Sequence, residues 1–179
     1  RNCAGGITPW NSWITCEEDT SRPNEGGQNP DDPMEQEHGY NFEVPARAEM
    51  QLHEAMPLKA MGRFRHEAVA VDPRMGIVYQ TEDRSDGLFY RFIPKTPGRL
   101  IEGGGLQALR IKDQRRADTR NFFEAKIKQG AKFAVEWVDV ENIQSPDDDL
   151  RYEGYFVSDA ARFARAEGIW YGRDAVHVA

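Results

Sequence analysis

Apolar and polar residues alternate in short runs along much of this chain, with the two-residue period of β-strands that bury one face. At 72–76, between two of these runs, an Asp-Pro-Arg-Met-Gly turn predicts a β-hairpin. The predicted strands lie at 13–19, 38–45, 68–71, 77–83, 86–94, 106–111, 133–140 and 174–179. The pattern therefore predicts a protein made mainly of antiparallel β-sheet.

Two segments depart from this alternation. Residues 20–37 contain three prolines, a glycine pair and almost no apolar side chain, so they predict a long surface loop between two strands. Residues 113–128 are polar, with Phe122, Phe123 and Ile127 on one side, and they predict the one short helix of the chain. Residues 144–149 hold an acidic run that predicts a solvated surface turn.

The chain also carries a diverged internal repeat. The segment 13–19 matches 77–83, with Glu18 aligned to Glu82 and Asp19 aligned to Asp83. A glycine turn and an aromatic strand follow each copy. This order of strand, acidic strand end, turn and aromatic strand is typical of antiparallel sheets stacked radially, as in propeller blades. The predicted fold class is all-β, a partial β-propeller of antiparallel blades with one short helical insertion.

Length and charge narrow the alternatives. The 179 residues are 39% hydrophobic, which is enough for one core, so 1–179 is predicted to be a single domain. The chain begins at Arg1 and ends in an alternating run, which we interpret as a fragment of a larger propeller. Apolar runs stay well short of the roughly 20 residues that span a bilayer, so we expect no membrane partner. The net charge of -7 argues against nucleic acid and suits cations.

The opening of the chain points to metal chemistry. A short apolar strand ends there in one thiol and three carboxylates, at Cys16, Glu17, Glu18 and Asp19. Carboxylate oxygens suit calcium and other hard cations, whereas a thiolate suits a transition metal, so a mixed cluster is indicated. The same acidic strand end would also serve as a solvated edge that discourages sheet pairing. Cys3 and Cys16, thirteen residues apart, are compatible with a disulfide or with metal ligation.

Three more sites place charged side chains at the rim of a strand. His66-Glu67 opens a strand, Glu82-Asp83 closes one, and residues 165–168 are predicted to open the last strand. In a propeller, the strand ends next to the axis converge from different blades, so carboxylates distant in sequence meet. We therefore expect carboxylates at these strand ends to gather around one ion cluster.

Several motifs resemble those of the PhoX-type alkaline phosphatases, in the same order and from the first residue nearly to the last. They are Asn-Cys-Ala-Gly-Gly at 2–6, Thr-Pro-Trp at 8–10, Thr-Cys-Glu-Glu at 15–18, Gly-Arg-Phe-Arg-His-Glu at 62–67, Tyr-Gln-Thr-Glu-Asp at 79–83 and Arg-Ala-Glu-Gly at 165–168. The opening motif is long and specific, and the last is short. The last blades of that family have no counterpart here, so the resemblance implies an incomplete site in this chain.

The resemblance implies a periplasmic or secreted phosphomonoesterase on a six-bladed propeller, with calcium and iron as cofactors. Cys3 is similar to the iron-ligating thiolate, and Arg165 to the side chain that grips phosphate. The carboxylates that the family shares among its ions are matched by Glu18, Glu67, Asp83 and Glu167, so the resemblance implies that these four lie close together. Cys16 stays an alternative to Cys3, and Glu17 an alternative to Glu18.

Two functions follow as expectations. The first is hydrolysis of a small-molecule phosphate ester at a calcium/iron cluster by a monomeric enzyme. A metal cluster neutralises phosphate charge and activates water, so it needs no protein nucleophile; the Gly-x-Ser-x-Gly elbow is indeed absent from the sequence. The second is a non-enzymatic, calcium-stabilised propeller that serves as a binding scaffold.

Overall fold

The computed structural model describes residues 2–25, 33–145 and 147–179, and in this part of the chain the fold is mostly β-sheet. The first sheet has the order β1-β2-β3, formed by Gly6–Ile7, Ser12–Cys16 and Asn41–Pro45. The second sheet has the order β4-β5-β6-β7-β8, formed by His66–Val71, Val78–Glu82, Phe89–Pro94, Gly104–Ile111 and Val135–Asp139. A hairpin of β9 and β10, Ile169–Tyr171 and Val176–Val178, follows.

Neighbouring strands within each sheet are antiparallel and consecutive in sequence. Two 3-10 turns, at Lys59–Met61 and Leu100–Glu102, and one α-helix, α1 at Leu150–Phe156, connect or cover the sheets. The predicted antiparallel sheets and hairpin are therefore confirmed, whereas β4 is buried along its whole length and does not alternate. None of the described helices is long and apolar enough to cross a membrane.

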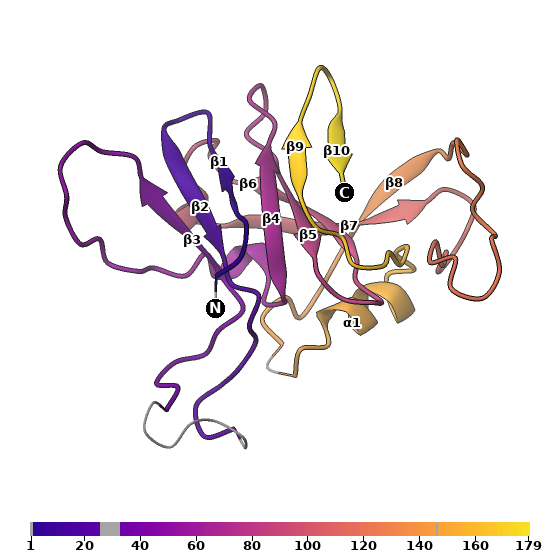
Figure 1. The fold of residues 1–179 in the computed structure, drawn as a ribbon, viewed down its shortest axis with the longest axis horizontal. Helices are drawn as coiled ribbons and strands as arrows, with labels where there is room; N and C mark the ends of the chain where they lie inside the picture. Colours follow the sequence, from indigo (N-terminus) through magenta and orange to yellow (C-terminus); the bar gives the residue numbers. More distant parts are fainter. Residues whose placement is uncertain (1, 26–32, 146) are drawn as a thin grey trace.

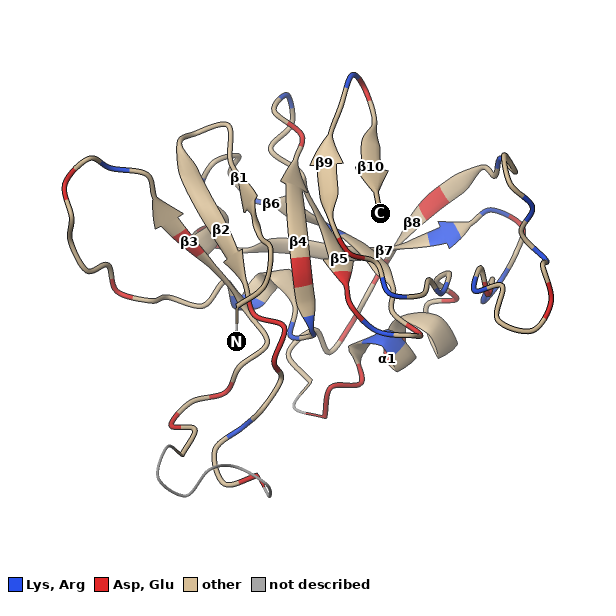
Figure 2. Ribbon diagram, in the orientation of Figure 1, with Lys and Arg blue, Asp and Glu red and all other residues tan. Residues whose placement is uncertain are grey.

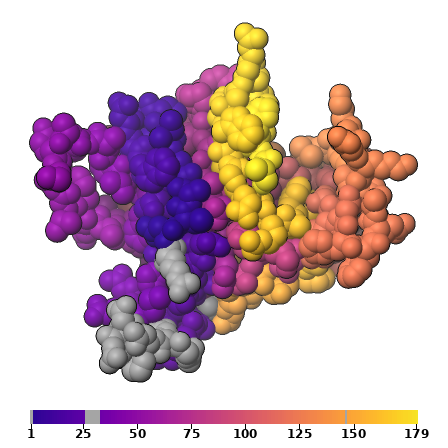
Figure 3. Space-filling model, viewed as in Figure 1, coloured from indigo at the N-terminus to yellow at the C-terminus, as the bar shows by residue number. Residues whose placement is uncertain are grey.

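The first strands of the three sheets, β1, β4 and β9, lie side by side and run in the same direction (Figure 1). Backbone hydrogen bonds join β1 to β4, because Gly5 N donates to Glu67 O at 3.0 Å and Val69 N donates to Gly5 O at 3.3 Å. In the space-filling view the N-terminal strands and the C-terminal hairpin share one face of the molecule (Figure 3). This arrangement brings equivalent ends of different sheets together. The described sheets form no closed barrel, and closure into a propeller stays a prediction.

Two glycines permit close backbone contacts at the start of the chain, Gly6 with β4 and Gly5 with β2. A Cβ atom on Gly6 would lie 2.1 Å from the carbonyl oxygen of Val69, which no side chain tolerates. Gly5 has a φ of +84°, and a Cβ atom there would lie 2.3 Å from the carbonyl oxygen of Ile14. The glycines thus allow two backbones to approach more closely than any other residue would.

The core lies on the second sheet and the segments packed against it. Tyr90 and Phe92, alternate residues of β6, are fully buried, and the ring of Phe64 stacks on that of Tyr90 with centroids 4.4 Å apart. Other fully buried members of this core come from separate elements, namely Ile14, Met61, Val78, Leu88 and Ala108. Burial of this apolar surface is the main force that holds the two sheets together.

The predicted helix at 113–128 is wrong, and that segment consists of turns and irregular backbone. Its apolar side chains have no surface to cover, since Phe123 is fully exposed and Phe122 is 56% exposed. The amide of Asn121 bonds both the N–H and the carbonyl of Ile127, an alternative to helical hydrogen bonds that Asn side chains commonly offer.

The helix lies instead at α1, directly after the acidic turn, where Leu150 enters the core. Seven residues span only two turns, which is too short for a helical period to stand out in the sequence. The surface loop predicted at 20–37 has no helix or strand in its described part, while residues 26–32 lie outside the described residues.

Candidate metal centre

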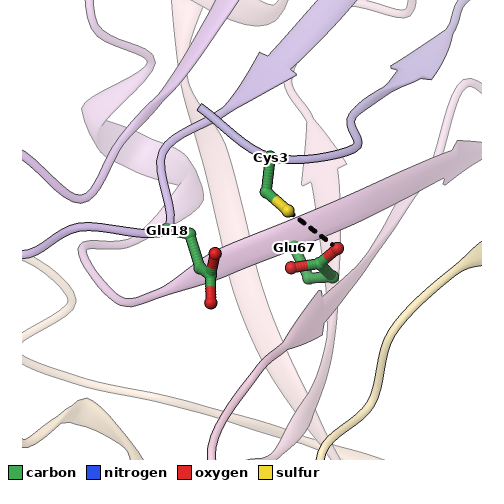
Figure 4. A group of neighbouring side chains, drawn as sticks. All are labelled: Cys3, Glu18 and Glu67. Carbon is green, nitrogen blue, oxygen red and sulfur yellow. Dashed lines mark hydrogen bonds between the residues drawn. The ribbon is translucent and has the colours of Figure 1, made fainter. Parts of the chain in front are cut away.

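Two overlapping groups of metal-ligating side chains lie at one edge of the sheets. Cys3, Glu18 and Glu67 each present a ligand atom within 4.8 Å of the others (Figure 4). Glu67, Asp83 and Glu167 form a second group within the same distance. Glu67 belongs to both, so the structure brings together all five residues proposed as ligands from the sequence.

The topology explains why these five residues meet. Cys3 precedes β1, Glu67 lies in β4 and Glu167 precedes β9, so three of them lie where a first strand begins. Glu18 and Asp83 follow β2 and β5, the second strands. In an antiparallel pair the start of one strand lies beside the end of the next. Acidic segments accordingly gather at this edge of the sheets (Figure 2).

A β-bulge directs Glu67 into the site. His66 pairs with Glu82 and Val69 pairs with Gln80, so two residues of β4 face the single residue Thr81 of β5. A bulge of this kind breaks the alternation of side chains and re-aims one of them, and bulges are frequent beside active sites. The alternation of the sequence did not reveal it.

The thiol of Cys3 donates a hydrogen bond to Glu67 Oε1 at 3.0 Å (Figure 4). This hydrogen bond, with partial desolvation and the charge of Glu67, raises the pKa of the largely exposed Cys3 thiol to about 11. Burial also raises the pKa of Glu67, and the nearby charges of Glu167, Glu18 and Asp83 add to the shift. Four carboxylates facing one another repel when ionised, and a bound cation removes that repulsion.

Arg165 lies at the outer side of the second group. Its Nη1 is 3.0 Å from Asp83 Oδ1 and its Nη2 is 3.6 Å from Glu167 Oε1. The first contact is an ion pair without hydrogen-bond geometry, and Asp83 Oδ1 is a buried oxygen with no hydrogen-bond partner among the described residues. The Arg165 side chain is 62% exposed, so its guanidinium is accessible from solvent.

The backbone at Arg165 differs from the prediction. Its φ is +53°, in the left-handed region, and β9 begins only at Ile169. Residues 165–168 therefore precede the last strand and do not open it. Because of this turn, Arg165 and Glu167 both lie beside Asp83. The backbone N–H of Arg165 donates to the carbonyl of Arg84 at 2.8 Å.

The two alternative ligands, Cys16 and Glu17, belong to neither group. Cys16 is fully buried in the core, and burial raises the pKa of its thiol well above the ordinary value. The carboxylate of Glu17 accepts hydrogen bonds from the backbone N–H groups of Gly39 and Tyr40, at 2.8 and 3.1 Å, and from His38. Cys3 and Cys16 are both free thiols in the structure.

The internal repeat is shifted by one residue from its predicted alignment. Glu82 accepts hydrogen bonds from the Leu88 N–H and the Tyr90 hydroxyl, so it ties its strand end to the next strand. Glu17 does the same for the turn before β3. Glu17 therefore corresponds to Glu82, and Glu18 corresponds to Asp83, since both face the site. The sequence showed an acidic pair at each of the two strand ends, but it did not show which member of each pair faces the metal site.

Comparison with known proteins identifies a family and a similar fold. The family model described as alkaline phosphatase PhoX matches residues 1–179. Among solved structures, the chain is similar to Pseudomonas fluorescens PhoX in complex with vanadate, a transition state analogue, with a TM-score of 0.58 and 18% identity. The similarity covers 94% of this chain and 37% of that one, so this chain spans little more than a third of that protein's length. No curated protein matches the chain.

Proposed function

This chain belongs to the alkaline phosphatase PhoX family, and we propose that the protein carrying it hydrolyses small-molecule phosphate esters at a centre of calcium and iron ions. In this proposal Cys3 ligates iron, and the four carboxylates of Glu18, Glu67, Asp83 and Glu167 are shared among the ions. We further propose that the protein is periplasmic or secreted, as its resemblance to the family implies. We also propose that it is a monomer.

The observation that supports this proposal most strongly is the convergence of one thiol and four carboxylates from three sheets. Carboxylate oxygens are the ligands that calcium prefers, and a thiolate favours a transition metal such as iron. The buried Asp83 oxygen without a hydrogen-bond partner is suited to a cation. The donors present therefore fit both kinds of ion.

In the proposed hydrolysis, the five ligand residues would hold the ions and Arg165 would bind the phosphate. Ions bound there neutralise the charge on the phosphate oxygens and lower the pKa of bound water. Arg165 would bind two phosphate oxygens, a role supported by its exposed guanidinium beside the carboxylates of Asp83 and Glu167. The thiol of Cys3, with its raised pKa, is a weak nucleophile without a metal, so a ligand role suits it better than covalent catalysis.

A second candidate is a calcium-stabilised scaffold without catalysis. The group of Glu67, Asp83 and Glu167 contains oxygen donors alone, so it would hold calcium without iron. It also links β4, β5 and the segment before β9, so an ion there would join the second sheet to the hairpin.

Elemental analysis and hydrolysis assays on the whole protein separate the two candidates. The protein is purified without added metal, and hydrolysis of p-nitrophenyl phosphate is measured before chelation, after chelation and after calcium and iron are restored. The proposed enzyme contains both metals and loses and regains its activity. Calcium without iron, together with no hydrolysis, would support the scaffold.

A further inference from the structure

Thr81 is a fully buried residue of β5 that faces the bulge carrying Glu67. Its hydroxyl accepts a hydrogen bond from the N–H of Ala68, the residue after Glu67, at 3.1 Å. The same oxygen lies 2.8 Å from the carbonyl oxygen of Glu167 and 3.2 Å from that of Ala68. One side chain thus touches the backbones of two segments that carry candidate ligands.

The chemistry of the hydroxyl fixes the direction of these contacts. A threonine hydroxyl has one proton to donate, and it accepts through its lone pairs. It accepts from Ala68, and the shorter distance assigns its proton to the carbonyl of Glu167. Thr81 and Glu167 are 86 positions apart in sequence, so the hydroxyl forms a long-range link between two strands' ends.

Few hydrogen bonds hold the segment 165–168 against the second sheet. In the described part of the chain they are the one from Thr81 to Glu167 and the backbone bond from Arg165 N to Arg84 O. The strands β9 and β4 lie beside each other but belong to different sheets, so no ladder of backbone bonds fixes their relative height. An ion pair between Arg165 and Asp83 adds to these hydrogen bonds, but among the described residues only the bond from Thr81 connects Glu167 itself to the second sheet.

We propose that Thr81 is a positioning residue of the metal centre, whose hydroxyl stabilises the bulge at Glu67 and holds Glu167 beside it. The inference rests on the proposed function, because it assigns the distance between two metal ligands to a residue that ligates nothing. Substitution should therefore weaken cation binding without removing any ligand atom.

Thr81→Val tests this in the whole protein, since valine keeps the shape of threonine and lacks the hydroxyl. Thr81→Ser is the rescue variant, because it keeps the hydroxyl. Thr8→Val is the matched control: the Thr8 hydroxyl is also buried, and it bonds Ser12 Oγ at 2.7 Å and Ser12 N at 3.0 Å, away from the five ligands. Two quantities are measured, namely calcium affinity by titration calorimetry and amide hydrogen exchange of Ala68 in metal-free protein.

The expected result for Thr81→Val is exchange at Ala68 about tenfold faster or more, and calcium affinity at least about tenfold weaker. Thr81→Ser should stay within about threefold of the unaltered protein, and Thr8→Val should leave calcium affinity unchanged. Unchanged calcium affinity in Thr81→Val overturns the inference, and so does unchanged exchange at Ala68. If the unaltered protein binds no calcium, the proposed function itself fails and this inference fails with it.

Discussion

The Sγ atom of Cys3 lies 3.0 Å from a carboxylate oxygen of Glu67, although 64 positions separate the two residues in sequence. The contact exists because the backbone before β1 lies directly against β4, where Gly5 N donates to the carbonyl of Glu67 and Gly5 O accepts from Val69 N. A thiol and a carboxylate in contact join a soft and a hard donor in one site. The predictions below test the parts of this arrangement one at a time.

Cys3→Ser should remove iron from the protein while leaving its stability within about 0.5 kcal/mol, because Cys3 is exposed and contributes little to packing. Cys16→Ser should do the opposite. It places a hydroxyl in the core, which costs about 1–3 kcal/mol, and leaves the iron in place. Iron content by atomic absorption and unfolding in urea measure the two effects. Loss of iron in Cys16→Ser alone would reassign the thiolate ligand.

Gly6→Ala should destabilise the protein by about 1–3 kcal/mol and reduce its metal content, since the new Cβ atom would force β1 away from Val69. Gly105→Ala is the matched control, because a Cβ atom there meets nothing within 4 Å. Its stability should change by no more than about 0.5 kcal/mol. Thermal unfolding and elemental analysis provide the comparison. Equal behaviour of the two variants would show that close approach of β1 and β4 is not needed.

Arg165→Ala should slow phosphate-ester hydrolysis while leaving the ions bound. Loss of a charge-assisted, two-pronged contact costs about 2–3 kcal/mol, or roughly a factor of 30 to 150 in rate. Arg99→Ala, which removes an exposed ion pair with Glu102, controls for loss of surface charge. Steady-state kinetics and metal analysis distinguish the outcomes. A variant with the parent's kcat and KM would exclude a substrate role for Arg165.

Asp159 should contribute stability that depends on pH. Its hydrogen bond to Arg115, followed by that to Arg116, lowers its pKa below the ordinary value. A lowered pKa in the folded state stabilises the protein above the pKa of the unfolded chain, and this contribution is lost as the pH falls through the folded value. Asp159→Asn should therefore be less stable than the parent at pH 7 and nearly equal to it near pH 2. Urea unfolding at both pH values checks this, and an equal difference at both would contradict it.

The sequence predicted strands such as β2 and β6 well because they bury alternate residues, as β6 does with Tyr90 and Phe92. It failed at 113–128, where tertiary contacts decide the conformation. Arg115 and Arg116 both bind Asp159, and the Tyr155 hydroxyl donates to the carbonyl of Arg116, so this segment is tied to the end of α1. Such long-range contacts leave no periodic signal in the sequence.

The candidate site was predictable in its residue types and less so in its geometry. Acidic pairs at the ends of two strands indicated where carboxylates gather. Which member of each pair faces the site depends on which one accepts hydrogen bonds from the segment that follows, and these are Glu17 after β2 and Glu82 in β5. The bulge opposite Thr81 and the left-handed backbone at Arg165 interrupt regular strand geometry. Alternation of apolar and polar residues carries no information about such interruptions.

We propose that Cys3 and the four carboxylates hold calcium and iron together. Anomalous diffraction from crystals of the whole protein, collected on both sides of the iron absorption edge, tests it most directly. We expect an iron peak beside the sulfur of Cys3 and calcium within about 2.6 Å of oxygens from Glu18, Glu67, Asp83 and Glu167. A map with no iron beside Cys3, and with these carboxylates in contact with water alone, would contradict it.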